Sequence, residues 1–232
     1  MNKDQIEKCF SKAASDYDSV ADIQRQSSQM LISLLDDLQN PTSVIDIGCG
    51  TGNTSLILQD KYPKAEYTLC DISQSMLDCA QKKFSKDVTL IHADAENYDF
   101  TQNYDLGISN LSMQWFLDIE KFLEKIMQAC RIFAFSTLTK SSFQSYREHF
   151  EFPPTFDYPT TDEILTWCNK AGAVKAYKTH RYIKTCNNFL AVAKYFRKLG
   201  AFARSNEQPV LKKSFSIPIS LEYEVIFVRL EK

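Results

Sequence analysis

The sequence predicts a single α/β domain built on an open, mostly parallel sheet that carries helices on both faces. Two observations support this prediction. Short apolar runs alternate with segments whose apolar residues recur at helical spacing, which is the pattern of parallel strands joined by helical crossovers. The 232 residues are also 44% hydrophobic and 24% charged, the ordinary balance of a folded domain, so a disordered chain is excluded.

The first half of the chain supplies four predicted strands and two helices. Apolar runs predict the strands at 44–47, 66–71, 88–93 and 104–109. A helix is expected at 53–62. Ser73 can cap the second helix, whose apolar positions share one face: Met76, Leu77, Ala80 and Phe84.

The second half continues the alternation. Asp118 can cap a helix with one apolar stripe, formed by Ile119, Phe122, Leu123, Ile126, Met127 and Cys130. A fifth strand is predicted at 131–138. Cap and stop signals at Thr161 and Gly172 bracket another helix, and late strands are predicted at 174–185 and 221–230.

Two helical segments lie outside this alternation, and we expect both to form lids. Residues 1–38 precede the first strand, and residues 187–214 separate the last two strands, with a helix that Gly200 ends. Ligands of doubly wound sheets bind beyond the carboxyl ends of the strands, where such helices can cover them. The domain, 1–232, is therefore divided into the lid 1–38, a cofactor-binding core at 41–140 and a substrate side at 141–232.

Composition excludes several classes of function. No apolar run approaches the roughly 18 residues of a membrane span, and the N-terminus lacks the apolar core of a signal peptide, so we expect a cytoplasmic protein. Seven scattered cysteines without a Cys-x-x-Cys pair indicate reduced thiols. With three histidines far apart in sequence, no metal site is expected.

Three of the six glycines lie together after the first strand, in Asp46-Ile47-Gly48-Cys49-Gly50-Thr51-Gly52. A dinucleotide-binding loop would place its third glycine where this chain has Asn53, which disfavours a nicotinamide dehydrogenase. Asp46 would repel a pyrophosphate but suits a ligand with a cationic amino group. S-adenosylmethionine combines adenosine, an amino acid and a positive charge, and we expect Gly48, Gly50, Gly52 and Asp46 to bind it.

Two more acids follow the next two strands and fit the same ligand. Asp71 ends the second strand, where its carboxylate can accept both ribose hydroxyls. Asp94, with Ala95, follows the third strand and is placed to take the adenine amino group. Ile72 and Met76 would offer apolar faces to the adenine ring.

In its glycine loop, its acids and their spacing, the segment from Val44 to Leu138 resembles the class I S-adenosylmethionine-dependent methyltransferases. The resemblance implies a Rossmann-like, seven-stranded sheet in which 221–230 is an antiparallel strand inserted near the edge. One departure is that the family's usual glycine-proline turn before the fifth strand is missing. This chain has Ala129-Cys130-Arg131 there.

A closer likeness runs almost end to end. It is carried by Phe10-Ser11-Lys12-Ala13-Ala14 with Tyr17-Asp18, by Ala21-Asp22-Ile23-Gln24-Arg25-Gln26, by Asn110-Leu111-Ser112-Met113-Gln114-Trp115 and by Leu199-Gly200-Ala201. These blocks resemble the malonyl-acyl-carrier-protein O-methyltransferases of biotin synthesis. That family methylates the free carboxylate of a malonyl thioester to prime the pimeloyl chain. The likeness implies the same acceptor and an acyl carrier protein partner here.

A malonyl carboxylate is already ionised near neutral pH, so its methylation needs no general base. The sequence shows no His–Asp or Cys–His pair, and we expect catalysis by positioning and exclusion of water. Tyr17 and Gln114 are expected to position the reacting groups, while Tyr17, Gln24, Asn110 and Leu111 complete the cofactor chamber. Arg147 and Arg181 are candidates for the cation that holds the malonyl carboxylate.

The stretch from Val174 to Ser214 is strongly basic, with ten lysines and arginines and one acid, although the whole chain has a net charge of −2. Acyl carrier proteins are acidic. Lys194, Arg197 and Lys198 share one helical face and, with Arg204 and Lys212, could dock such a carrier. No nucleic-acid-binding module is visible, and we expect a monomer that binds neither nucleic acid nor membrane.

Two alternatives to this function remain open. The acceptor could be a small free carboxylic acid, such as aconitate, or a quinone precursor. The chain could also be a binding module that holds S-adenosylmethionine without catalysis, although the glycine loop and the lid helix disfavour this alternative.

Overall fold

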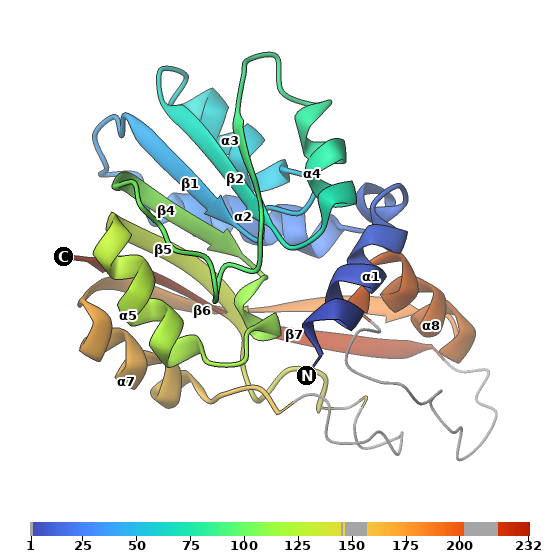
Figure 1. Ribbon diagram of the computed structural model, residues 1–232. Coiled ribbons are helices and arrows are strands. Elements are labelled where there is room, and N and C mark those ends of the chain that lie inside the picture. The colour runs from blue at the N-terminus through green and yellow to red at the C-terminus, as the bar shows by residue number, and fades with distance from the viewer. Residues whose placement is uncertain (1, 145, 147–156, 202–217) are drawn as a thin grey trace.

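The computed structural model describes residues 2–144, 146, 157–201 and 218–232 (Figure 1). Arg147, Arg204 and Lys212, expected to bind the substrate or the carrier, lie outside the described residues.

Helices and strands alternate as the sequence predicts. The helices are α1 (Lys3–Ala13), η1 (Tyr17–Ser19), α2 (Asp22–Ser33), α3 (Asn53–Lys61), α4 (Gln74–Gln81), η2 (Met113–Trp115), α5 (Ile119–Ala129), α7 (Thr161–Ala171) and α8 (Phe189–Lys198). The strands are β1 (Ser43–Ile47), β2 (Glu66–Asp71), β3 (Thr89–His92), β4 (Tyr104–Asn110), β5 (Cys130–Leu138), β6 (Ala173–Cys186) and β7 (Ile219–Glu231).

The strands form one seven-stranded sheet in the order β3-β2-β1-β4-β5-β7-β6. The pairs β1–β2, β2–β3, β1–β4 and β4–β5 are parallel. Strand β7 lies between β5 and β6 and is antiparallel to both. The predicted sheet, with its antiparallel strand next to the edge, is confirmed.

A separate hydrophobic core covers each face of the sheet. Because neighbouring side chains of a strand point to opposite faces, Ile132 and Ala134 of β5 pack in the core under α2, α3 and α8, whereas Phe133 and Phe135 pack under α5 and α7. Figure 1 shows α5 and α7 together on one side of the sheet. Helices on both faces bring the carboxyl ends of β1, β2, β3 and β4 to one shared edge.

Some predicted boundaries were wrong by a few residues. The helix after Ser73 ends at Gln81, so Phe84 lies beyond it. The cap of α7 is Thr160 rather than Thr161. Its hydroxyl accepts from the Glu163 N–H at 3.2 Å while the Glu163 carboxylate accepts from the Thr160 N–H at 2.8 Å, a complete capping box.

Helix α5 passes into β5 without a turn, since it ends at Ala129 and the strand begins at Cys130. The Cys130 N–H still donates to the Ile126 carbonyl, so the last helical turn is closed as the strand starts. This direct passage accounts for the missing glycine-proline turn.

The N-terminal helices lie against the rest of the domain. Ala13 and Ala14 pack on Met76 of α4, and the hydroxyls of Ser11 and Ser73 lie 2.8 Å apart. At the other side of α1, the end of α8 approaches closely, since a Cβ added to Gly200 would come within 2.8 Å of the Phe10 ring. Within the described ranges, every helix is too short or too polar to span a lipid bilayer.

Candidate active site

A cavity opens at the carboxyl edge of the first four strands and encloses about 870 Å³, its mouth included. Its walls come from the ends of these strands and from the loops and helix starts that follow them: Gly48, Cys49, Gly50, Thr51, Asn53, Thr54, Cys70, Asp71, Ile72, Met76, Ala93, Asp94, Ala95, Asn110, Leu111, Ser112, Trp115 and Phe116. The N-terminal segment adds Lys3, Ile6, Phe10, Tyr17, Gln24 and Ser28, so the predicted lid lines the same cavity.

The glycine loop adopts a backbone conformation that favours glycine, with φ of +64° at Gly48 and +54° at Gly50. A Cβ on Gly48 would lie 1.8 Å from the Ser112 hydroxyl, so the two loops after β1 and β4 can meet only because this side chain is absent. A Cβ on Gly50 would meet nothing within 4 Å. Gly50 therefore leaves room on the cavity wall for a ligand to approach the backbone.

Asp71 is held rigidly at the tip of β2. Its Oδ2 accepts from the Gly50 N–H and its Oδ1 from the Ser73 N–H, both at 2.8 Å. Burial raises the pKa of the Asp71 carboxyl, and these two hydrogen bonds oppose the rise. Each oxygen keeps a further lone pair, so the carboxylate can accept hydroxyl donors from the cavity.

Asp46 lies beneath the glycine loop and does not line the cavity. It is buried, and its Oδ2 accepts from the Ser55 hydroxyl at 2.6 Å, which ties β1 to α3. Burial, and to a smaller extent the nearby charge of Asp71, raise the pKa of Asp46 to about 7. Gly52 is also away from the cavity, since a Cβ there would meet Phe84 and Ala80 at 3.0 and 3.1 Å.

Asn110 uses its whole side chain to hold the lid helix α2. Its Oδ1 accepts from Ser27 at 2.7 Å and Ser136 at 2.8 Å, and its Nδ2 donates to the Gln24 carbonyl and the Ser28 hydroxyl, both at 3.0 Å. The amide is thus satisfied by protein groups. Asn110 contributes to the cavity chiefly by fixing the lid to the end of β4.

Gln114, like Asp46, does not line the cavity. Its Nε2 donates to the Leu111 carbonyl at 2.6 Å, and its Oε1 accepts from Thr137 at 3.5 Å. Leu111 has a φ of +49°, an uncommon conformation for leucine. The Gln114 side chain therefore supports the strained turn after β4, and the structure places Leu111 rather than Gln114 at the cavity.

Tyr17 and Gln24 face the cavity from the lid. Burial raises the pKa of the Tyr17 phenol, and the charges of Asp71 and Asp18 add to the rise, so the side chain stays a neutral hydrogen-bond donor. The Gln24 Oε1 is buried and has no hydrogen-bond partner among the described residues. Because buried polar atoms are normally paired, this amide points to a ligand.

Of the residues expected to contact the substrate or carrier, those that the structure describes lie away from the cavity. Arg181 of β6 is exposed and pairs with Glu224 at 3.1 Å. Lys194 and Arg197 are exposed on α8, and Lys198 lies 3.6 Å from Asp16.

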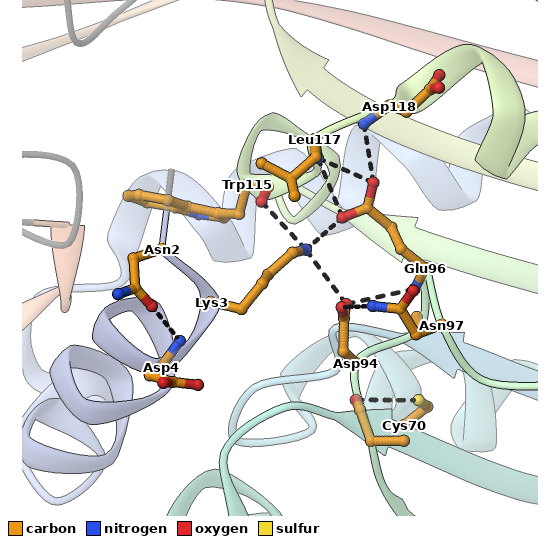
Figure 2. A network of polar contacts seen from close by, with 12 residues as sticks. Asn2, Lys3, Asp4, Cys70, Asp94, Glu96, Asn97, Trp115, Leu117 and Asp118 are labelled. Atoms are coloured by element: carbon orange, nitrogen blue, oxygen red, sulfur yellow. Dashed lines mark hydrogen bonds and ion pairs between the residues drawn. The ribbon is translucent and has the colours of Figure 1, made fainter.

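The sequence reasoning missed two anchors of the lid. Lys3 reaches Asp94 at 3.2 Å and also pairs with Glu96 (Figure 2). In the middle of the lid, Asp18 accepts from Thr51 at 2.6 Å and from Asn53 at 2.9 Å. A signal for Lys3 existed, because Lys3, Ile6 and Phe10 recur at the spacing of one helix face.

Comparisons with known proteins agree with this geometry. Residues 44–132 match the family described as "Methyltransferase domain". The chain is 28% identical to the malonyl-[acyl-carrier protein] O-methyltransferase of Acetivibrio thermocellus, over 98% of this chain and 88% of the relative. It is 30% identical to the protein of the same name from Neorickettsia risticii, over 71% of this chain and 68% of the relative.

A solved S-adenosylmethionine-dependent methyltransferase of Thermotoga maritima has the same fold, with a TM-score of 0.61 and 17% identity over 98% of this chain and 99% of that one. The chain is therefore an S-adenosylmethionine-dependent methyltransferase of class I and belongs to the family of the malonyl-[acyl-carrier protein] O-methyltransferases.

Proposed function

We propose that the chain transfers a methyl group from S-adenosylmethionine to the free carboxylate of a malonyl group that an acyl carrier protein carries as a thioester. The similarity over 98% of the chain to a relative named for this reaction supports the acceptor. The ester would serve as the primer for pimeloyl and biotin synthesis, as in that family.

The observation that carries the proposal is the chemistry of the cavity wall. None of the described lining residues is a histidine, Asp71 is held by two N–H groups, and burial raises the pKa of the Cys49 thiol. An amine or alcohol acceptor would need a base to take its proton, whereas a carboxylate arrives ionised. The two acids of the described wall, Asp71 and Asp94, are already engaged, the first by two N–H groups and the second by Asn97 and Lys3, and such a wall fits a carboxylate acceptor.

S-adenosylmethionine would supply the methyl group from a positively charged sulfonium, and the neutral thioether S-adenosylhomocysteine would be the leaving group. Asp71 would accept the ribose hydroxyls, Asp94 and Ala95 would border the adenine amino group, and Ile72 and Met76 would cover the ring. Gly48 and Gly50 would allow close approach at the loop. These assignments use residues that line one cavity.

At the lid end of the cavity, Tyr17 would donate a hydrogen bond, and the unpaired Gln24 Oε1 would accept one from the ammonium group of the bound amino acid. The lid would also exclude water, which strengthens such polar contacts. Asp46 would act from beneath the loop by holding α3. Gln114 would position the reacting groups by supporting Leu111.

The carrier would dock on α8. Leu190, Lys194 and Arg197 recur at i, i+4 and i+7 and therefore share one face, with Leu190 78% exposed. An apolar side chain beside two cations fits the acidic surface of a carrier protein. Arg181, paired with Glu224, is a second candidate contact.

The test compares acceptors with methyl-labelled S-adenosylmethionine. Malonyl carrier protein, malonyl coenzyme A, free malonate and aconitate are offered separately to the purified chain. We expect a base-labile labelled ester on the carrier, formed faster than on any free acid. Faster labelling of a free acid would contradict the proposed acceptor, and binding of the cofactor without any transfer would indicate a binding module.

A further inference from the structure

The first residue of α1 lies in an unusual setting for a lysine. The Lys3 Nζ is 3.2 Å from Asp94 Oδ1, pairs with the Glu96 carboxylate and lies 3.5 Å from the Trp115 carbonyl (Figure 2). It is also 5.0 Å from the centre of the Phe116 ring. The Lys3 side chain is only 19% exposed. One ammonium therefore meets two carboxylates, a carbonyl and an aromatic face, and three of these four groups belong to residues that line the cavity, Asp94, Trp115 and Phe116.

The two carboxylates that pair with Lys3 are also held by other hydrogen bonds. Glu96 accepts from the N–H groups of Leu117 and Asp118, each within 3.0 Å, and so holds the start of α5. Asp94 accepts from the Asn97 side chain at 2.7 Å. Since both acids are held by other hydrogen bonds, breaking the Lys3 ion pairs would leave the acids in place and release α1.

The remaining contacts of α1 with the wall are neutral. The Phe10 ring meets the Trp115 ring edge-on, with 5.3 Å between centres, and Ser11 meets Ser73. In the described part of the chain, the ion pairs that α1 makes are those of Lys3. Within the described residues, Lys3 therefore makes all the ion pairs between α1 and the rest of the domain.

We propose that Lys3 is a positioning residue that latches α1 over the cavity, so that uptake of S-adenosylmethionine and release of S-adenosylhomocysteine depend on opening its ion pairs. Lys3 and Asp94 both line the cavity, and a ligand seated against Asp94 lies beside their contact. The inference rests on the proposed seating of the cofactor, but it does not depend on the identity of the methyl acceptor.

The test measures the release rate of S-adenosylhomocysteine from the purified chain by stopped-flow fluorescence. Trp115 is one of only two tryptophans and lines the cavity, so it can report occupancy. We expect Lys3→Met to release S-adenosylhomocysteine about tenfold faster than the wild type and to have a higher KM for S-adenosylmethionine. Lys3→Arg keeps the positive charge and should have the wild-type release rate and KM. Glu96→Gln removes the same ion pair from the wall and should also speed release.

The salt dependence of the release rate distinguishes a latch from a merely structural role of Lys3. Raising the ionic strength from about 0.05 M to about 0.5 M should speed release from the wild-type chain and affect Lys3→Met much less. Lys8→Met, at an exposed position of the same helix, is the matched control and should behave like the wild type.

Two results would overturn the latch. The first is that Lys3→Met and Lys8→Met have the same release rate and the same response to salt, although the wild-type chain binds the product. The other is a wild-type chain that binds neither cofactor nor product, which would also contradict the proposed seating. A failure to methylate malonyl carrier protein, with release behaving as expected, would contradict only the proposed acceptor.

Discussion

The Asp71 carboxylate accepts a hydrogen bond from the backbone N–H of Gly50, with 2.8 Å between Oδ2 and the nitrogen. Its other oxygen accepts from Ser73, the N-cap of α4. One acid thereby sets the glycine loop after β1 relative to the helix after β2. The wall that is proposed to hold the adenosine is thus organised before a ligand arrives.

Asp71→Asn tests this organisation. An amide offers one oxygen where the carboxylate offers two, so one buried N–H loses its acceptor, at a cost of about 1–3 kcal/mol in the free energy of unfolding. We expect this loss in urea unfolding and at least a tenfold weaker affinity for S-adenosylhomocysteine in calorimetry. Asp87→Asn, at an exposed position, is the control and should change neither.

The pH dependence of stability should reveal Asp46. Its pKa is raised to about 7 in the folded chain, above its ordinary value of 3.8, so the folded state binds the extra proton. Stability should therefore fall as the pH rises from about 4 to about 7, by up to about 1.4 kcal/mol per pH unit.

Asp46→Asn should remove that contribution. The check is the difference in free energy of unfolding between wild type and Asp46→Asn, measured at about pH 5 and about pH 8. The wild type should lose stability relative to the variant at the higher pH. A difference independent of pH would show that Asp46 titrates normally.

Two alanine substitutions in the glycine loop should behave differently. Gly50→Ala has room for its Cβ and should cost only about 1 kcal/mol of stability from the positive φ, while weakening cofactor binding. Gly48→Ala drives its Cβ into Ser112 and should cost about 3 kcal/mol or more. Adding Ser112→Gly should recover part of that loss, and no recovery in thermal unfolding would refute the clash.

Asn110→Leu should free the lid helix. It removes the hydrogen bonds that Asn110 makes to Ser27, Ser28 and the Gln24 carbonyl, and it leaves Ser27 with only a 3.4 Å contact to Ser136, at a cost of about 2–4 kcal/mol. Hydrogen exchange should rise in Asp22–Ser33 more than in Ile119–Ala129, which lies on the other face of the sheet. Equal changes in both helices would mean that Asn110 contributes only to global stability.

The docking face of α8 can be tested by charge reversal. Lys194→Glu with Arg197→Glu should raise the KM for malonyl carrier protein about tenfold at low salt and leave the KM for S-adenosylmethionine unchanged. Lys64→Glu with Lys121→Glu, which reverses two charges at exposed positions outside α8, is the matched control. An equal effect of both changes would point to overall charge rather than to a docking face.

The fold could be predicted from the sequence because each strand and helix has a local signal. Apolar runs mark the strands, and the caps Ser73 and Asp118 begin their helices as expected. Thr160 was missed by one residue because Thr161 is an equally good cap by type. Only the reciprocal bonds with Glu163 distinguish the two threonines.

The site was predictable where residues follow strands directly. Asp71, Asp94 and Asn110 reach the cavity because parallel strands deliver their carboxyl ends to one edge. Helical spacing places Lys3 on the same face as Ile6 and Phe10, but no local pattern reveals that its partners are Asp94 and Glu96, which lie far away in sequence. Likewise, the sequence could not show that Asp46 and Gln114 turn away from the cavity, because both sit beside residues that line it.

The mass of malonyl carrier protein after incubation with the chain and S-adenosylmethionine tests the central claim most directly. The account predicts that the carrier gains one methyl group and loses it on mild base treatment. A carrier of unchanged mass, beside a free carboxylic acid that becomes methylated in the same mixture, would contradict it.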